Sequence, residues 1–143
     1  MSDETTTQKR QRDRLIEGNE VAAGLGVEVT EAGGGRATVI MTVGPEMTNS
    51  QGVCHGGVIF TLADCALEYA SNSHGPTTVA AAASIDFVRP ALVGTVLTAV
   101  CQERHRGRVA GNYDVEVTDS EGRIVALVRA RSHEIGDRLE GPE

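Results

Sequence analysis

One long apolar run dominates the pattern of hydrophobic and polar positions. From Gly57 to Ala70 nearly every residue is apolar or small, and Asp64 and Glu68 are the only charged residues. A continuous apolar run of this length is too long for one buried strand, so it predicts a helix from about Gly56 to Ser73. Because a helix that is hydrophobic on almost every side is usually buried, we expect it to lie in the core.

Most of the remaining chain alternates apolar and polar residues, as β-strands do. Two strands are predicted before the helix and four after it, over 26–30, 36–43, 77–88, 95–103, 109–118 and 123–134. The short connections between them are rich in turn-forming residues, which favours antiparallel pairing. The predicted fold class is therefore α+β, with a single helix against one antiparallel sheet. Such a sheet leaves an open edge and a second face, so we expect oligomerisation.

The two ends of the chain are polar. Residues 1–12 and 137–143 are expected to be disordered tails, and a short helix over 13–23 leads into a single domain spanning 13–136. The N-terminus lacks the apolar segment of a signal peptide, and no stretch approaches the roughly 20 apolar residues that span a bilayer. Three cysteines without CxxC or metal-ligand spacing do not indicate a disulfide framework. We expect a cytoplasmic protein.

Composition and charge exclude some classes of partner. The net charge is −7 and only 3% of the residues are aromatic, which argues against binding to nucleic acid or to an anionic membrane. The acidity is uneven, however, because residues 89–131 hold seven arginines and five acidic residues. Within that segment, the arginines of the 104–108 hairpin have the planar geometry that binds phosphate groups. The simpler interpretation of the hairpin is a solvated turn.

Asp64 is the residue that most indicates chemistry. Burying a carboxylate in an apolar helix costs several kcal/mol unless the group is paired, hydrogen-bonded or protonated. Two glycines, Gly56 and Gly57, stand at the predicted helix start, where backbone N–H groups can stabilise a developing anion. Asp64 lies about 12 Å further along the helix axis, too far to hold the same substrate atom. We therefore expect Asp64 of one subunit to meet the glycines of a partner at a dimer interface.

Each candidate residue also has an ordinary structural interpretation. Asn49 can be a turn former, His55 can cap the helix, and the glycine pair can simply allow close packing. Asp64 and Glu68 share one stripe of the helix with Thr61, which is also what a polar seam at a subunit interface would show. Repulsion between the two carboxylates can raise the pKa of one of them. No histidine lies at helical spacing to complete a metal site.

Several motifs together resemble the PaaI-type phenylacetyl-CoA thioesterases of the hotdog-fold superfamily. The similarity runs from Leu25 to Ile135 and is specific, because it joins many separate segments rather than a single HGG tripeptide. The residues that carry it are Asn49, Cys54-His55-Gly56-Gly57, Leu62-Ala63-Asp64, Tyr69-Ala70-Ser71-Asn72-Ser73, Ile85-Asp86-Phe87-Val88-Arg89-Pro90, Tyr113-Asp114-Val115-Glu116 and Ser132-His133.

The resemblance implies a hotdog fold, with a curved antiparallel sheet wrapped around the helix, dimers that share a continuous sheet, and a tetramer built as a dimer of dimers. It implies that Gly56 polarises the thioester carbonyl through its N–H, that Asp64 from the partner subunit attacks or activates water, and that Asn49 contacts substrate or water. No cofactor or metal is implied. The further candidates for binding substrate are His55, Gly57, Glu68, Arg89, Arg106 and Arg108.

The implied activity is hydrolysis of (hydroxy)phenylacetyl-CoA-like thioesters to free acid and CoA, as in phenylacetate degradation. The chain departs from the pattern at Glu68, where related enzymes often carry a small or hydroxyl residue, so the water-positioning role there is unassigned. Two alternatives stay open: a hotdog hydratase or dehydratase, and an acyl-CoA sensor without catalysis. Release of CoA, and its loss on changing Asp64, distinguishes the thioesterase from both.

Overall fold

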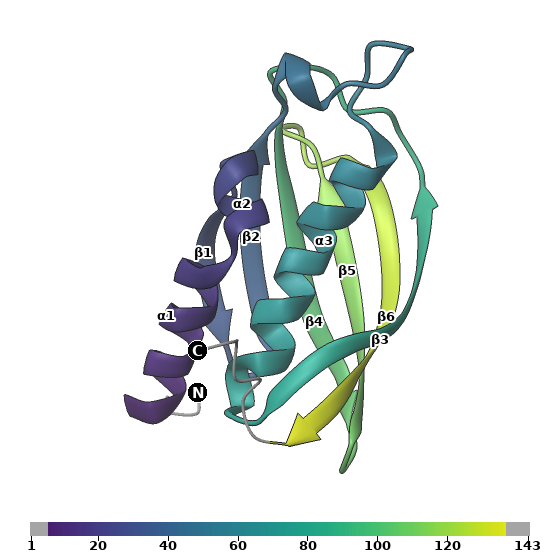
Figure 1. Cartoon of the computed structure of the whole chain (residues 1–143). Helices are drawn as coiled ribbons and strands as arrows, with labels where there is room; N and C mark the ends of the chain where they lie inside the picture. Colours follow the sequence, from purple (N-terminus) through teal and green to yellow (C-terminus); the bar gives the residue numbers. More distant parts are fainter. Residues whose placement is uncertain (1–5, 137–143) are drawn as a thin grey trace.

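The computed structural model describes residues 6–136, and it folds around the long apolar helix that the sequence predicts (Figure 1). A six-stranded antiparallel sheet curves around this helix, which gives the hotdog architecture and confirms the α+β prediction. The helices are α1 (Thr6–Gly18), α2 (Glu20–Leu25) and α3 (Gly56–Ser71), and the strands are β1 (Glu28–Gly33), β2 (Arg36–Thr42), β3 (Thr77–Phe87), β4 (Val96–Arg106), β5 (Ala110–Thr118) and β6 (Ile124–Gly136). Short 3₁₀ turns lie at Pro45–Met47 and Asn72–His74.

The core lies between α3 and the concave face of the sheet. Along β2, Ala37, Val39 and Met41 are buried while the residues between them are not, as the two-residue period of a strand requires. Small side chains on α3, such as Ala63 and Ala66, are completely buried and allow the helix to lie close to the strands. This packing also determines where the remaining residues of α3 lie, including Asp64 and Glu68.

The sheet order is β1-β2-β4-β5-β6-β3, so the strand that follows α3 lies at the far edge. Most of β3 is exposed in the single chain, in contrast to the alternating burial of β2 and β5. Val79 is 37% and Phe87 55% exposed, although both are apolar. An edge strand with unpaired backbone groups and exposed apolar side chains is a surface that can pair with another chain.

Hydrogen bonds from Asn72 join the end of α3 to the start of β3. Its Oδ1 accepts a hydrogen bond from Thr78 N–H at 2.9 Å, and its Nδ2 donates to the carbonyl oxygens of Glu68 at 2.8 Å and of Thr78 at 3.3 Å. Thr78 Oγ1 also donates to Ser71 Oγ at 2.7 Å. These bonds hold the start of β3 against the C-terminal end of α3.

The N-terminal region differs from the sequence prediction. A disordered tail was expected as far as Arg12, but α1 begins at Thr6 and runs to Gly18. The physical reason is tertiary: Leu15 and Ile16 pack against the core and anchor the helix. Residues 1–5 and the predicted C-terminal tail at 137–143 lie outside the described residues. No helix in the described range is long and apolar enough to cross a membrane.

Candidate active site

His55 caps the start of α3. Its backbone is extended, and its Nδ1 accepts a hydrogen bond from Gly57 N–H at 2.8 Å. An accepting Nδ1 carries no proton, so the neutral ring has its hydrogen on Nε2. The carbonyl oxygen of His55 accepts hydrogen bonds from Val58 and Ile59 N–H, which begin the helix. His55 therefore has the structural role of a cap, and Gly57 N–H already has a partner.

Gly56 N–H is the amide at this helix end that donates to no group in the described part of the chain. It lies at the positive end of the α3 dipole, where a negative oxygen is stabilised. A Cβ on Gly56 would lie 3.0 Å from Phe87 Cζ, so any larger residue here would require the exposed Phe87 ring to shift. The sequence analysis placed Phe87 in one of the family motifs but not among the site residues, and its signal was a rare aromatic residue at the end of a strand.

Asn49 organises the loop before α3. Its Oδ1 accepts hydrogen bonds from Gln51 N–H at 3.0 Å and Val53 N–H at 3.3 Å, and its own N–H donates to the Val53 carbonyl at 2.8 Å. The turn-forming interpretation is therefore correct for this oxygen. The Nδ2 group makes no hydrogen bond with the described residues and is the part of Asn49 that can contact a substrate or a water molecule.

Asp64 and Glu68 lie two and three turns further along α3, both half-buried. Burial raises the pKa of Asp64. Burial and then the charge of Asp64 raise the pKa of Glu68, while a hydrogen bond from Asn19 opposes the increase. Burial, with smaller contributions from Glu68 and Asp64, raises the pKa of Cys65 to about 11. Cys65 is thus a neutral thiol, and the two carboxylates are the candidate proton acceptors at this site.

Both carboxylates line one groove of about 810 Å³ between α1, α3 and the start of β3. Its walls combine apolar and small residues with the two acids and with two exposed arginines of α1. The lining residues are Arg10, Arg14, Leu15, Gly18, Asp64, Leu67, Glu68, Ser71, Asn72, Thr77, Thr78, Val79 and Ala80. A groove of this size and composition can take an acyl group of moderate size beside a carboxylate.

Asn19, between α1 and α2, contacts the acids from outside α3. Its Nδ2 donates to Glu68 Oε2 at 2.9 Å. Asp64 makes no hydrogen bond with the described residues, so the two acids differ in how firmly they are held. The sequence prediction missed Asn19, although an asparagine followed by Glu20 is the signature of a helix start.

Within one chain, the structure keeps Gly56 and Asp64 apart. They belong to the same straight helix, with an axial separation of about 12 Å for eight residues. Gly56 lies beside Phe87 at the end of β3, whereas Asp64 shares the groove with Thr77 to Ala80 at the beginning of that strand. The single chain therefore holds the Gly56 amide and the Asp64 carboxylate apart on one helix.

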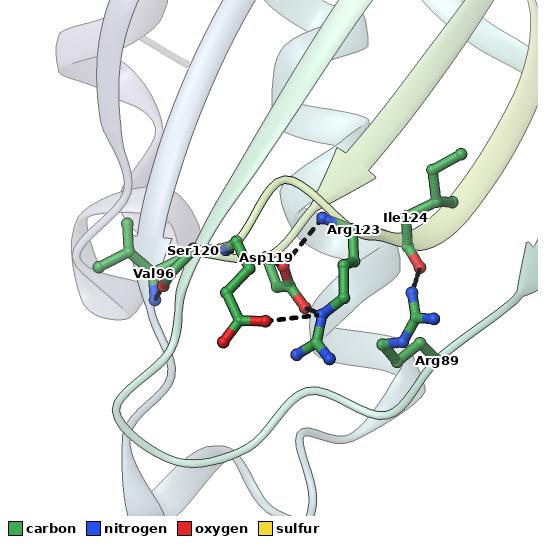
Figure 2. Close-up of polar contacts among 7 residues, drawn as sticks. Arg89, Val96, Asp119, Ser120, Arg123 and Ile124 are labelled. Carbon is green, nitrogen blue, oxygen red and sulfur yellow. Dashed lines mark hydrogen bonds and ion pairs between the residues drawn. The ribbon is translucent and has the colours of Figure 1, made fainter.

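Arg89 lies near the start of α3, just after β3. Its Nη1 donates to the Ile124 carbonyl at 3.0 Å (Figure 2). Beside it, Arg123 Nε pairs with Asp119 Oδ2 at 2.9 Å. Burial works against the charge of Asp119, but hydrogen bonds from Arg123 and Glu121 hold its pKa below the ordinary value. Among the described residues, Arg89 has no carboxylate partner, so its charge is available to an anion at the edge of this pocket of about 370 Å³.

Arg106 and Arg108 lie at the opposite end of the sheet. The segment that leads into β4 begins near the start of α3, because the carbonyl oxygen of Ala91 accepts a hydrogen bond from Cys54 N–H at 2.8 Å. The 11-residue strand β4 then runs away from it and ends at Arg106, about 33 Å further on. In one chain, the two hairpin arginines are therefore not brought together with Gly56 or Arg89.

This fold and site define a thioesterase of the hotdog type. The family model described as the thioesterase superfamily matches residues 51–126, and the chain belongs to this superfamily. The acyl-coenzyme A thioesterase PaaI of Escherichia coli is 43% identical over 127 residues, which cover 89% of this chain and 91% of that protein.

Two solved structures show the same architecture. The E. coli PaaI protein from the phenylacetic acid degradation operon superposes with a TM-score of 0.91 at 40% identity, covering 94% of this chain and 98% of that one. A hypothetical thioesterase from Streptococcus pneumoniae, solved with coenzyme A, gives a TM-score of 0.75 at 29% identity, covering 78% of this chain and 88% of that one.

Proposed function

We propose that the protein is an acyl-CoA thioesterase that hydrolyses phenylacetyl-CoA-like thioesters to the free acid and CoA. Similarity to the acyl-coenzyme A thioesterase PaaI supports the reaction, and the origin of that protein in a phenylacetic acid degradation operon supports an aryl-acetyl substrate. The CoA in the pneumococcal relative supports CoA as the thiol. Acyl-CoA substrates also favour a cytoplasmic location.

The observation that carries this proposal is a helix with two groups that have no hydrogen-bond partner within residues 6–136: the Gly56 N–H at its start and the half-buried carboxylate of Asp64. An amide at a helix N-terminus stabilises the oxyanion that forms from a thioester carbonyl, an effect of about 3–4 kcal/mol per donor in other acyl-transfer enzymes. A carboxylate of raised pKa is a base or nucleophile suited to neutral pH.

The reaction joins these two groups through the substrate. Asp64 removes a proton from water, the resulting hydroxide attacks the thioester carbon, and the carbonyl oxygen becomes negative against Gly56 N–H. The C–S bond then breaks, the thiolate leaves as CoA and takes up the proton, and the acid is released. In the alternative route the Asp64 carboxylate attacks the carbon itself, and water hydrolyses the anhydride that forms. Both routes need the same two groups.

The site is complete only when two chains combine. We propose that the exposed edge of β3 pairs with a second β3, which makes one continuous sheet and brings Gly56 of one subunit close to Asp64 of the other. The exposed apolar side chains of β3, including Val79 and Phe87, support this pairing. Two such dimers then form the tetramer. The groove beside Asp64 receives the acyl group, and Arg89 binds a CoA phosphate at the mouth of the site.

A release assay for the free thiol tests the proposal. Purified protein is incubated with phenylacetyl-CoA, hydroxyphenylacetyl-CoA and a series of aliphatic acyl-CoAs, and CoA is measured with a thiol reagent. We expect turnover that is fastest with the aryl substrates and that falls by about 10³-fold or more in Asp64→Ala. The proposal fails if no thioester is hydrolysed, or if Asp64→Ala releases CoA at the rate of the unchanged protein.

A further inference from the structure

The orientation of the Asn19 amide is fixed by two neighbours with opposite requirements. Its Oδ1 caps α2 by accepting a hydrogen bond from Ala22 N–H at 3.0 Å. The same amide therefore directs Nδ2 to the other side, where it donates to Glu68 Oε2 at 2.9 Å and approaches Cys65 Sγ at 3.8 Å. Turning the amide over would place two donors against each other at Ala22, so only one orientation satisfies the cap.

The Asn19 amide holds only one of the two carboxylates, Glu68. Glu68 and Asp64 are separated by one helical turn and line the same groove, so their side chains can approach each other. Without an anchor, a protonated Glu68 could donate a hydrogen bond to Asp64 and occupy it. The bond from Asn19 instead holds Glu68 towards the α1–α2 junction, and Asp64 keeps no partner among the described residues.

We propose that Asn19 is a positioning residue for hydrolysis, which holds Glu68 away from Asp64 and so leaves Asp64 free to face the substrate. This inference rests on the proposed thioesterase function and adds the α1–α2 junction, which lies outside the residues 51–126 matched by the family model, to the machinery of the site. Asn19 does not touch the reacting atoms, because it acts through Glu68.

The charge environment of Glu68 determines how a change at Asn19 acts. From α3, the titratable groups near Glu68 are Asp64, Cys65 and Tyr69, and β3 adds only uncharged residues to the groove. Two arginines of α1, Arg10 and Arg14, line the same groove and are exposed. The hydrogen bond from Asn19 is the one described contact that favours the charged form of Glu68 through a direct donor.

Substitutions that preserve the helix cap separate positioning from folding. Asn19→Asp and Asn19→Ser both keep a cap oxygen for Ala22, but neither supplies the N–H that Glu68 needs. Asn19→Asp also places a second negative charge beside Glu68. Val21→Glu is the matched control, because it adds the same charge to α2 at a side chain that is 61% exposed. Steady-state kinetics with phenylacetyl-CoA are measured from pH 5 to pH 9, together with the Tm.

We expect Asn19→Asp to lower kcat by about 10-fold with little change in KM, and to move the acid limb of the kcat profile to higher pH, because an added charge disfavours ionisation of the Asp64–Glu68 pair. Asn19→Ser should lower kcat with a smaller shift of the acid limb. The Tm should change little in both, and Val21→Glu should match the unchanged protein in kcat and in pH profile.

A second variant tests the role of Asn19 by reversing the hydrogen bond between residues 19 and 68. In the double variant Asn19→Asp/Glu68→Gln, the glutamine Nε2 can donate to the new carboxylate, so donor and acceptor are exchanged while the geometry is kept. We expect Asn19→Asp to lower kcat by less than about 3-fold when it is made in the Glu68→Gln protein, compared with about 10-fold in the unchanged protein.

Equal loss in the two backgrounds, or an Asn19→Asp protein with unchanged kcat and pH profile, would overturn the positioning role. The proposed function is tested separately by the same preparations. If the unchanged protein hydrolyses no acyl-CoA, the thioesterase proposal fails. If it does so and Asp64→Ala is inactive while the Asn19 variants behave like Val21→Glu, only the role of Asn19 fails.

Discussion

At the scale of single residues, two kinds of residue on α3 are unusual for a buried helix: a glycine at its start, Gly56, and two acids, Asp64 and Glu68. Gly56 has no side chain, so its N–H can be approached closely, and the ring of Phe87 covers the position where a Cβ would be. Asp64 and Glu68 are polar groups placed where apolar residues would be more stable. Both features fit the requirements of the proposed acyl-transfer site.

Gly56→Ala separates these two roles of Gly56. The new Cβ would meet Phe87 at about 3.0 Å, so we expect a lower Tm and a fall in kcat/KM of about 10- to 100-fold. Adding Phe87→Ala removes the steric contact and should restore the Tm, while hydrolysis should stay low because the methyl group still obstructs the approach to the N–H. Recovery of hydrolysis in the double variant would show that the glycine serves packing alone.

Glu68→Gln should stabilise the protein at neutral and alkaline pH. Burial and the Asp64 charge raise the pKa of Glu68 in the folded protein, so the folded state binds this proton more tightly than the unfolded state does. Stability is therefore lost as the pH rises from the unfolded-state pKa, about 4.3, through the raised folded-state pKa. Glutamine avoids this loss, and its Oε1 can still accept the bond from Asn19.

The expected gain for Glu68→Gln is present at pH 8 and shrinks as the pH approaches 4. Urea unfolding at the two pH values measures it, with the exposed and neighbouring Glu20→Gln as the control. A gain of the same size at both pH values would contradict the electrostatic explanation, because a protonated glutamic acid and a glutamine then differ little in charge.

At the scale of elements, the sequence predicted every strand and the long helix, because periodicity and turn residues agree there. The helix was expected to end at Ser73 and ends at Ser71, where Asn72 begins a 3₁₀ turn and bonds to Thr78. Helix α1 was only partly predicted, since residues 6–12 are polar and have no local signal. Its position depends on contacts with α3 that are distant in sequence.

The parts of the candidate site that lie on a single helix could be predicted from the sequence. Gly56 and Asp64 could be found because each breaks a local expectation on an apolar helix. Asn19 could not, because its contact with Glu68 joins residues 49 positions apart. The sequence also could not show which arginines lie near the site. Arg89 and Arg106 were equal candidates for binding phosphate, but the length of β4 places them at opposite ends of the sheet.

The cap on α3 gives a prediction at the scale of elements. His55→Ala removes the acceptor of Gly57 N–H, and we expect a loss of about 1 kcal/mol in unfolding free energy. Asparagine is among the best capping residues, so His55→Asn should recover most of that loss. Chemical denaturation of the three proteins measures the difference. If His55→Asn is as unstable as His55→Ala, the imidazole contributes through a contact other than the cap.

At the scale of the whole molecule, the chain of 15.0 kDa holds Gly56 and Asp64 apart on one helix and leaves β3 exposed at the edge of its sheet. These facts have one common explanation in a second copy of the chain. Pairing through β3 would bury the exposed edge and would also place the oxyanion-binding amide of each subunit opposite the carboxylate of the other. Stability and catalysis would then depend on the same interface.

Mixing two impaired variants tests whether the site is shared. An Asp64→Ala subunit keeps its Gly56, and a Gly56→Ala subunit keeps its Asp64. If catalysis joins these groups across the interface, a mixed dimer contains one intact site and one doubly defective site. Random exchange makes half of the dimers mixed, so refolding the two variants together should restore about a quarter of the unchanged protein's thioesterase rate.

If each chain used its own Gly56 and Asp64, every site in the mixture would carry one defect, and the rate would stay at the level of the two separate variants. Sedimentation of the mixture establishes that dimers have re-formed, so that a low rate cannot come from failed assembly. The same measurement on the unchanged protein should give a mass of at least twice 15.0 kDa. A monomeric protein with full hydrolysis would exclude the shared site, because a monomer has no partner subunit to supply Asp64.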